Sequence, residues 1–184
     1  MTERSIDTGR SIGTGRSISR RGALGTAAAA GLAAFFPAAS PAHAAVPLRS
    51  GLYTISRFQW QFLTLNEAEG AVVLLPEGIG GGQVWEVQVL ANGNTTVRNV
   101  KEGSYLGYAR SREIRKRVMG HAVPVEWSLD KTANGHHLKA PGTALALDGS
   151  PLRIYPPHID LTALRPEDPA QVWQFRATSL SSRP

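Results

Sequence analysis

A short apolar pattern centred on tryptophan occurs three times in this chain and limits what the chain can fold into. Trp85, Trp127 and Trp173 lie 42 and 46 residues apart, and each stands two residues before another large apolar side chain. Alternate residues of a strand share one face, so each tryptophan and this neighbour point to one side while polar residues point to the other. Large apolar pairs at near-regular spacing indicate three copies of one structural unit around a shared core.

The repeat extends beyond the tryptophans, because four short strand candidates can be laid over one another in each unit. Ile55 precedes Trp85 by 30 residues, and Val97 precedes Trp127 by the same number. No window shows helical periodicity, so the predicted fold is all-β, with three pseudo-symmetric four-strand units closing a barrel. Closure removes exposed sheet edges that would otherwise favour aggregation. The strand candidates are residues 52–55, 62–65, 72–75, 83–87, 95–97, 105–108, 117–119, 125–129, 136–138, 144–147, 152–155 and 171–175.

The third unit is longer than the other two. Leu138 lies 35 residues before Trp173, whereas the matching interval in the first two units is 30 residues. We expect the additional residues within 156–170, a stretch rich in proline and charge, with one short helical turn at residues 159–164. Asp148-Gly149 separates two strand candidates and predicts a hairpin turn.

The first 44 residues resemble an export signal. Arg20 and Arg21 precede an apolar run over residues 23–36, and Ala42-His43-Ala44 offers small residues at a cleavage site. A charged segment, an apolar segment and a small-x-small site in this order are typical of signal peptides. The paired arginines favour the twin-arginine route of bacteria. We therefore expect a secreted, extracellular protein from which residues 1–44 are removed.

Residues 45–184 are expected to form a single domain. The leader holds five arginines against two acidic residues, which leaves the remainder a net charge of +3 out of +6. A general nucleic-acid binder carries a larger surplus, so nucleic acid is not an expected partner. The chain has no cysteine, which excludes thiolate chemistry and thiolate metal sites. No second long apolar segment follows the leader, so we predict no membrane attachment once the leader is removed. We also predict a monomer.

Enzyme chemistry finds little support in the sequence. The chain has no nucleophile elbow, phosphate-binding loop or metal-ligand motif, and we predict neither catalysis nor a bound metal or cofactor. His136 and His137 are adjacent, so a strand would direct them to opposite faces, which is poor geometry for a shared metal.

The order and spacing of the motifs resemble the ricin-B type of β-trefoil, in which each four-strand unit ends in a Gln-x-Trp strand. More narrowly, five passages resemble the cospin-type serine protease inhibitors of mushrooms. The middle unit departs from the pattern, because Val125 replaces the glutamine and removes its side-chain hydrogen bond. The passages are Gly51-Leu52-Tyr53-Thr54-Ile55, Phe62-Leu63-Thr64-Leu65-Asn66, Gln83-Val84-Trp85, residues 97–107 and Gln171-Val172-Trp173-Gln174-Phe175.

This resemblance implies a β-trefoil that inhibits an extracellular, trypsin-like serine protease through an exposed loop between the second and third strands of a unit. In the first unit that loop carries Glu67 and Glu69, which a pocket built around a buried carboxylate would repel. The matching loop of the second unit is basic. We predict it to bind the protease, with Arg112 or Arg115 entering the pocket beside Ile114. The candidate residues are Arg110, Arg112, Ile114, Arg115, Lys116 and Arg117.

Other interpretations of these residues remain open. The basic loop is also compatible with a solvated charged hairpin or with a patch for anionic glycans and cell-wall polymers. Asn99 would suit an asparagine-specific protease, as in related mushroom inhibitors, but a turn-forming role explains it more simply. Trp60 lies outside the repeat, between Phe58 and Phe62, and fits either an interface anchor or a cap on the barrel mouth.

Carbohydrate binding is the alternative function, because ricin-type lectins share the predicted fold. The resemblance implies sugar sites that use an aspartate early in each unit together with a stacking aromatic. The first two units have no aspartate ahead of their tryptophan, and in the third Asp148 would serve. Protease inhibition is therefore the predicted function, with glycans as the alternative partner.

Overall fold

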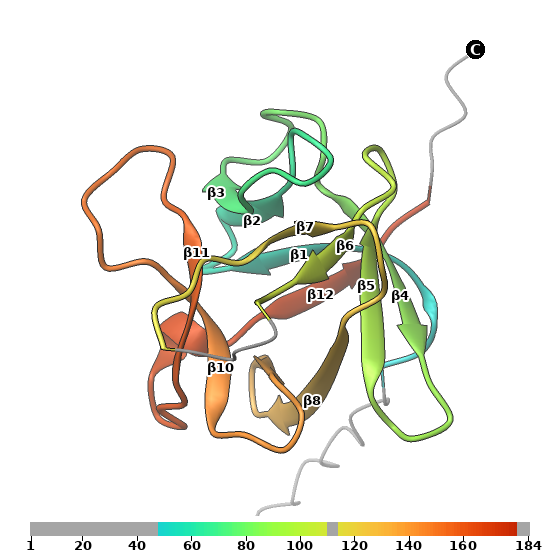
Figure 1. The fold of residues 1–184 in the computed structure, drawn as a ribbon, viewed down its shortest axis with the longest axis vertical. Helices are drawn as coiled ribbons and strands as arrows, with labels where there is room; N and C mark the ends of the chain where they lie inside the picture. Colours follow the sequence, from blue (N-terminus) through green and yellow to red (C-terminus); the bar gives the residue numbers. More distant parts are fainter. Residues whose placement is uncertain (1–47, 110–113, 180–184) are drawn as a thin grey trace, which may run out of the picture. The chain divides into compact units, whose positions relative to one another are not determined.

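The computed structural model describes residues 48–109 and 114–179, which form twelve β-strands and one short 3-10 helix (Figure 1). The prediction of an all-β chain is confirmed. The export signal predicted for residues 1–44 lies outside the described residues. The elements are β1 (Gly51–Arg57), β2 (Gln61–Thr64), β3 (Val73–Leu75), β4 (Val84–Val89), β5 (Thr95–Asn99), β6 (Tyr105–Gly107), β7 (Met119–His121), β8 (Glu126–Thr132), β9 (Gly135–Lys139), β10 (Leu145–Gly149), β11 (Ile159–Ala163), η1 (Pro169–Gln171) and β12 (Gln174–Ala177).

Six strands, two from each unit, form the wall of a barrel. Antiparallel ladders join β12, β1, β4, β5, β8 and β9 in this order. The ring is completed between β9 and β12 by two backbone hydrogen bonds of 2.9 Å that His136 and Trp173 exchange. Gly135 permits this approach, because a Cβ atom there would lie 2.4 Å from the Trp173 carbonyl oxygen. The predicted closure is thus made by one bridge, and the sheet is not closed by continuous ladders.

The other six strands form three hairpins that meet at a pseudo-threefold axis. The hairpins are β2–β3, β6–β7 and β10–β11. At their meeting point the Val72 amide donates to the Val118 carbonyl, the Val118 amide to Ile159, and the Ile159 amide to Val72, over 2.8–3.1 Å. All three side chains are fully buried. This closed cycle of three equivalent bonds is the direct mark of three repeated units.

Each unit holds its tryptophan in the same way. The three indoles are fully buried, and each indole N–H donates to a backbone carbonyl in the second strand of its own unit. A buried N–H requires a partner, so each tryptophan ties a wall strand to its hairpin. All three tryptophans thus belong to the buried core. The bonds run from Trp85 to Leu63 (3.0 Å), from Trp127 to Leu106 (2.9 Å) and from Trp173 to Leu147 (3.0 Å).

The third unit differs from the prediction in two places. The segment expected as a helical turn is strand β11, which pairs with β10 from Leu145 opposite Ala163 to Gly149 opposite Ile159. Its alternate residues Ile159 and Leu161 are fully buried, so the segment supplies core side chains as a strand does. Residues 152–155, expected as the third strand, belong instead to an exposed loop.

Removal of one buried indole N–H should destabilise the barrel. Trp173→Phe leaves the Leu147 carbonyl oxygen without its donor, so we expect the free energy of unfolding to fall by about 1–3 kcal/mol. Trp60→Phe is the control, because Trp60 is 60% exposed. It should change that free energy by less than about 0.5 kcal/mol. Urea unfolding followed by far-UV circular dichroism measures both, and equal effects would contradict the role given to the indole bond.

The junction of β9 and β12 should weaken in acid. The His136 ring packs edge-on against Phe175, and burial, together with the charge of Lys131, lowers the pKa of His136 below its ordinary 6.5. As the pH falls, the unfolded chain therefore takes up the His136 proton before the folded chain does. The contribution of His136 to stability is full above the ordinary pKa and is lost as the pH falls below it.

His136→Gln should therefore reduce the difference in urea midpoint between about pH 7.5 and about pH 5. Part of the difference should remain, because burial and Arg117 also lower the pKa of His158. A pH dependence identical to that of the wild type would show that His136 does not contribute.

Candidate functional site

Pseudo-threefold symmetry places one equivalent side-chain cluster in each unit. Each cluster consists of three residues. One comes from the second strand of the unit, one from the third strand, and one stands two positions before the tryptophan, and the strand registers show that these positions correspond in all three units. Because the backbone is repeated, differences among the clusters come from the side chains alone. The three sets are Thr64, Leu75 and Gln83 in the first unit, Gly107, His121 and Val125 in the second, and Asp148, Thr162 and Gln171 in the third.

In the first unit a buried glutamine fills the cluster. The Gln83 side-chain amide donates to the Thr64 hydroxyl at 3.1 Å and to the carbonyls of Pro76 and Ile79 at 2.8 and 3.0 Å. Its oxygen accepts from the Gly78 amide at 2.8 Å. These four bonds tie the segment before β4 to β2, and they leave no free polar group of Gln83 to meet a ligand.

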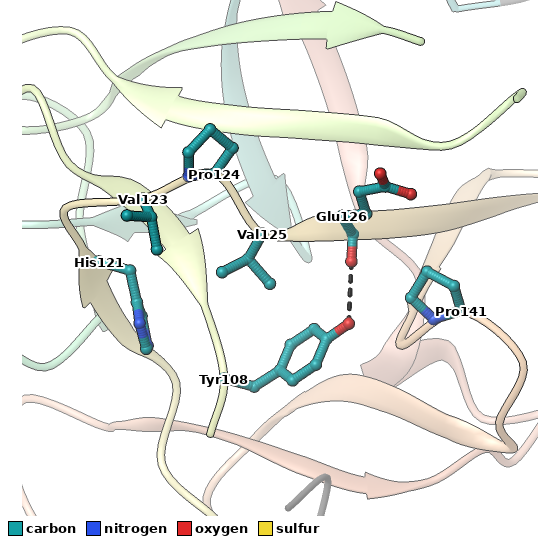
Figure 2. A pocket seen from close by; sticks show the side chains of 7 residues that line it. All are labelled: Tyr108, His121, Val123, Pro124, Val125, Glu126 and Pro141. Atoms are coloured by element: carbon teal, nitrogen blue, oxygen red, sulfur yellow. Dashed lines mark hydrogen bonds between the residues drawn. The ribbon is translucent and has the colours of Figure 1, made fainter. Parts of the chain in front are cut away.

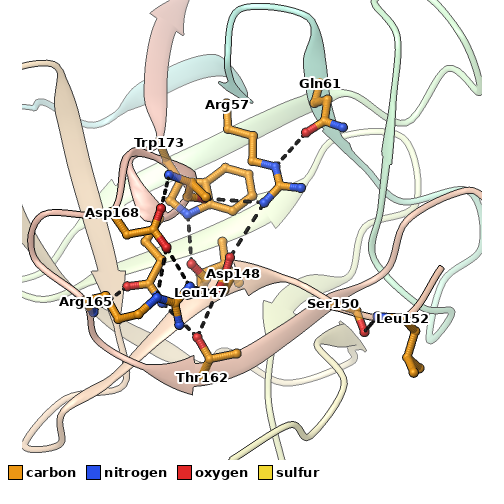
Figure 3. Close-up of polar contacts among 12 residues, drawn as sticks. Arg57, Gln61, Leu147, Asp148, Ser150, Leu152, Thr162, Arg165, Asp168 and Trp173 are labelled. Carbon is orange, nitrogen blue, oxygen red and sulfur yellow. Dashed lines mark hydrogen bonds and ion pairs between the residues drawn. The ribbon is translucent and has the colours of Figure 1, made fainter. Parts of the chain in front are cut away.

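The third unit is closed in the same way, with a carboxylate added (Figure 3). The Gln171 amide donates to the Thr162 hydroxyl at 2.8 Å and to the Asp148 carboxylate at 3.2 Å. Asp148 is 4% exposed and also pairs with Arg165 at 2.8 Å and with Arg57 at 3.6 Å. The aspartate that the lectin alternative singled out is therefore buried and fully engaged with the protein's own side chains.

Arg57 connects this cluster to the first unit. Its guanidinium donates from Nε to the Gln61 side chain at 2.7 Å and from Nη1 to the Ala170 carbonyl at 3.4 Å. Burial lowers the pKa of Arg57, and the nearby charges of Asp148 and Asp168 oppose that change. The Asp148 carboxylate thus balances a partly buried cation that the end of β1 brings to the third unit.

The second unit lacks the bridging amide that the other two units share. Val125 has no amide to bridge the strands, and Gly107 has no side chain. A cleft of about 640 Å³ lies here, between the second unit and the β9–β10 turn (Figure 2). The lining residues are Tyr108, His121, Val123, Pro124, Val125, Glu126 and Pro141.

Two rings fix the shape of this cleft. The Tyr108 ring packs edge-on against Trp127 with centroids 4.8 Å apart, and its hydroxyl donates to the Glu126 backbone carbonyl at 2.9 Å. His121 packs against Gly107 so closely that a Cβ atom on the glycine would lie 2.4 Å from the imidazole Cδ2. The imidazole is partly exposed and offers both a donor and an acceptor to a ligand.

The charge of Glu126 is directed away from the cleft. Figure 2 shows its carboxylate on the side of β8 opposite Tyr108. There the side-chain amides of Asn94 and Asn92 donate to Oε2 at 2.7 and 3.0 Å, and these hydrogen bonds lower the pKa of Glu126. The cleft therefore combines apolar walls with a partly exposed imidazole and backbone groups, which suits a polar ligand.

The basic loop predicted to bind a protease is described in part. Arg110 and Arg112 lie outside the described residues, while residues 114–117, which comprise Ile114, Arg115, Lys116 and Arg117, are exposed before β7. The backbone here is fastened to β11, because the Arg115 amide donates to the Leu161 carbonyl at 2.6 Å and the Leu161 amide donates to Lys116 at 2.9 Å. The binding role of these residues stays a prediction.

The other predicted contact residues have separate positions. Asn99 is fully buried, its amide donates to the Gly82 carbonyl at 2.8 Å, and its oxygen accepts from two amides of the following turn. This is the turn-forming role. Glu67 and Glu69 are exposed in the β2–β3 loop beside a different, shallow cleft. Among the described residues no three histidine, aspartate or glutamate side chains gather to hold a metal ion, and no helix is long and apolar enough to cross a membrane.

Val125 in place of glutamine is the sequence signal for the different cluster of the second unit, because no amide bridges the strands there. The position of Gly107 becomes informative only once the strand register aligns it with Thr64 and Asp148. The space beside this glycine is occupied by His121 and Val125, which would lie 2.4 and 2.9 Å from a Cβ atom on it.

Comparisons with known proteins agree on the architecture. No protein-family model and no curated protein matches the chain. The agglutinin of Rhizoctonia solani is similar with a TM-score of 0.65 and 21% identity, covering 72% of this chain and 99% of its own. The ricin B-like lectin of Macrolepiota procera, solved with lactose, is similar with a TM-score of 0.62 and 20% identity, covering 71% and 98%. The fold is a β-trefoil.

A third solved structure extends the comparison. The Polyporus squamosus lectin, bound to a sialylated human-type influenza-binding epitope, matches with a TM-score of 0.60 and 16% identity, over 71% of this chain and 50% of that one. The ricin-B-like part of the predicted resemblance is confirmed as a fold, while the narrower likeness to cospin-type inhibitors stays a prediction from sequence motifs.

The prediction of serine protease inhibition is wrong. The three similar structures named above are an agglutinin and two lectins, the latter solved with sugar ligands, and none of them is a protease inhibitor. The reason for the error is physical. The Gln-x-Trp strands and apolar segments that carried the resemblance build the trefoil core, which lectins and inhibitors share, whereas the loops that separate these functions gave no positive match.

The Asp148 cluster should be needed for stability. Asp148→Asn leaves the partly buried Arg57 guanidinium without its paired carboxylate, so we expect a loss of about 3 kcal/mol in the free energy of unfolding. Glu86→Gln is the matched control, because it breaks an exposed pair with Arg98 at 3.9 Å. It should cost less than about 1 kcal/mol. Urea unfolding compares the two, and a small effect of Asp148→Asn would mean that the carboxylate is held for another purpose.

Proposed function

We propose that this protein is a carbohydrate-binding β-trefoil without catalytic activity, and that its sugar site is the open cleft of the second unit. The observation that carries the proposal is the contrast among the three equivalent clusters. Glutamine side chains bridge two of them, whereas His121 and Val125 of the third cluster line a cleft of about 640 Å³. Support also comes from the match over nearly the whole length of two fungal lectins, one of them solved with lactose.

The cleft has the chemistry that a sugar ring requires. Small-molecule sites have volumes of roughly 300–1,000 Å³ and combine apolar walls with a few polar groups. Val123, which is 61% exposed, and Pro141 supply walls for the C–H face of a pyranose. His121 and the backbone of residues 123–126 supply hydrogen-bond partners for hydroxyl groups. Because the Glu126 carboxylate points away, a neutral sugar is the expected ligand.

Secretion is part of the same proposal. The export signal predicted for residues 1–44 would bring the protein to the extracellular space, where glycans are displayed. Whole-cell fractionation with an antibody to the protein tests this part separately from sugar binding.

Sugar binding should depend on His121. The mature protein would be screened on an array of neutral and sialylated oligosaccharides, and its best ligands and lactose would be measured by isothermal titration calorimetry. We expect binding by the wild type and a loss of about tenfold or more in affinity for His121→Ala. Gly107→Ala, which displaces the imidazole, should reduce affinity as well.

His158→Ala is the matched control, since His158 is partly exposed at the base of the β10–β11 loop, and it should leave affinity unchanged. Thermal unfolding of every variant separates loss of binding from loss of folding. A wild type that binds no sugar on the array or in calorimetry would overturn the proposed function.

A further inference from the structure

The turn between β1 and β2 has a strained backbone and two exposed aromatic rings. Phe58 and Gln59 have φ angles of 51° and 64°, in the left-handed region that L side chains rarely adopt. In the second and third units the matching turns place Gly103 and Gly142 in this region, each with φ of 71°. The first unit thus keeps large side chains where its two counterparts use glycine, and strain of this kind marks functional sites.

The two aromatic rings form a stack supported from inside the protein. Phe58 and Trp60 are stacked, with ring centroids 6.5 Å apart and planes inclined by 25°. The partly buried Arg57 guanidinium lies 5.5 Å from the Phe58 ring centroid and is itself held by Gln61 and Asp148. The exposed fraction is 43% for Phe58 and 60% for Trp60, so Trp60 is the outer ring of the stack. Trp60 therefore presents a flat apolar face to solvent on a rigid base.

A groove with neutral polar groups runs beside this stack. A cleft of about 490 Å³ is lined by Phe58 and by three amide side chains, those of Gln59, Asn134 and Gln174. None of these three amides makes a side-chain hydrogen bond within the described residues, and Pro169 and Val172 complete the lining. The central cleft contains no ionisable side chain, so its polar groups are free donors and acceptors without charge.

The groove continues on both sides of the central cleft. Gln59 and Gln174 also line a neighbouring cleft of about 330 Å³, beside Glu77 and Arg176, which pair with each other at 3.0 Å. Asn134, Pro169 and Val172 also line another of about 240 Å³, together with the acidic residues Glu167 and Asp168. Shared lining residues make the three spaces adjacent, and together they are longer than one sugar ring requires.

From these observations we propose a second binding site at this groove, which takes a linear oligosaccharide of neutral sugars. The Phe58–Trp60 stack would receive the C–H face of one pyranose, and the amides of Gln59, Asn134 and Gln174 would bond hydroxyl groups of its neighbours. This inference rests on the proposed carbohydrate-binding function and adds a site built from other residues and other units. It also explains why Phe58 and Gln59 adopt the left-handed backbone conformation with large side chains, because glycine at these positions would provide neither the aromatic ring nor the amide.

Tryptophan fluorescence tests the second site directly. The chain has four tryptophans, and Trp85, Trp127 and Trp173 are fully buried, so acrylamide should quench Trp60 selectively. The probes are cellotetraose, maltotetraose and chitotetraose added to the mature protein. We expect at least one of them to lower the quenching constant of Trp60 by about threefold and to bind about tenfold more weakly to Trp60→Ala. His121→Ala should leave this binding unchanged.

Phe58→Gly separates binding from stability. Glycine relieves the left-handed strain, so the urea midpoint should stay equal or rise, while oligosaccharide affinity falls about tenfold. Ile79→Ala is the matched control, because Ile79 is an exposed apolar residue, 53% exposed, and should change neither quantity.

Three outcomes would overturn the second site. The first is that no probe protects Trp60. The second is that sugars bind but only His121→Ala weakens them, in which case the proposed function stands and this inference falls. The third is that acrylamide quenches Trp60 less as the protein concentration is raised, because a second copy of the chain would then cover the stack.

Discussion

The hydrogen bond from each buried indole to a hairpin carbonyl is the interaction on which this structure depends. It is repeated three times with nearly the same length, and in each unit it joins a wall strand to a hairpin that the chain forms about twenty residues earlier. With the indoles fixed, the hairpins meet in the cycle of amide bonds among Val72, Val118 and Ile159. The backbone is thereby set by a few repeated contacts, and most other positions are free to differ.

The three units use that freedom differently. At one set of equivalent positions, a glutamine bridges the strands of the first unit, and a glutamine with a carboxylate bridges those of the third, where the carboxylate also pairs with the partly buried Arg57. In the second unit Val125 and His121 line a cleft instead. A repeated backbone with unequal side chains explains how one fold supports a stability cluster and a binding cleft at the same place in different units.

The sequence predicted the core far better than the loops. The spacing of the tryptophans and the alternation of apolar residues indicate which side chains are buried. Because each unit buries the same positions, these patterns predicted the trefoil and the burial of Trp85, Trp127 and Trp173. Residues 152–155 were predicted as a strand because Leu152, Ile154 and Tyr155 are apolar, yet they are exposed. Strand β11 was missed because the charged Asp160 separates the fully buried Ile159 and Leu161. The functional error had a related cause, since the basic side chains at residues 110–117 do not show what they bind. The open cleft depends on contacts between residues distant in sequence, which no local pattern displays.

The pairing of β1 with β12 has a consequence for how the unit can be built into larger proteins. Tyr53 lies opposite Ala177, and the Thr178 amide donates to the Leu52 carbonyl at 2.9 Å, so the two ends of the described trefoil lie side by side. A short linker would therefore join them into a continuous ring, and new ends opened at an exposed turn such as Asn92-Gly93 would keep every wall strand. The trefoil could likewise be inserted into a surface loop of a host protein, because its adjacent ends would require little separation of the flanking host residues.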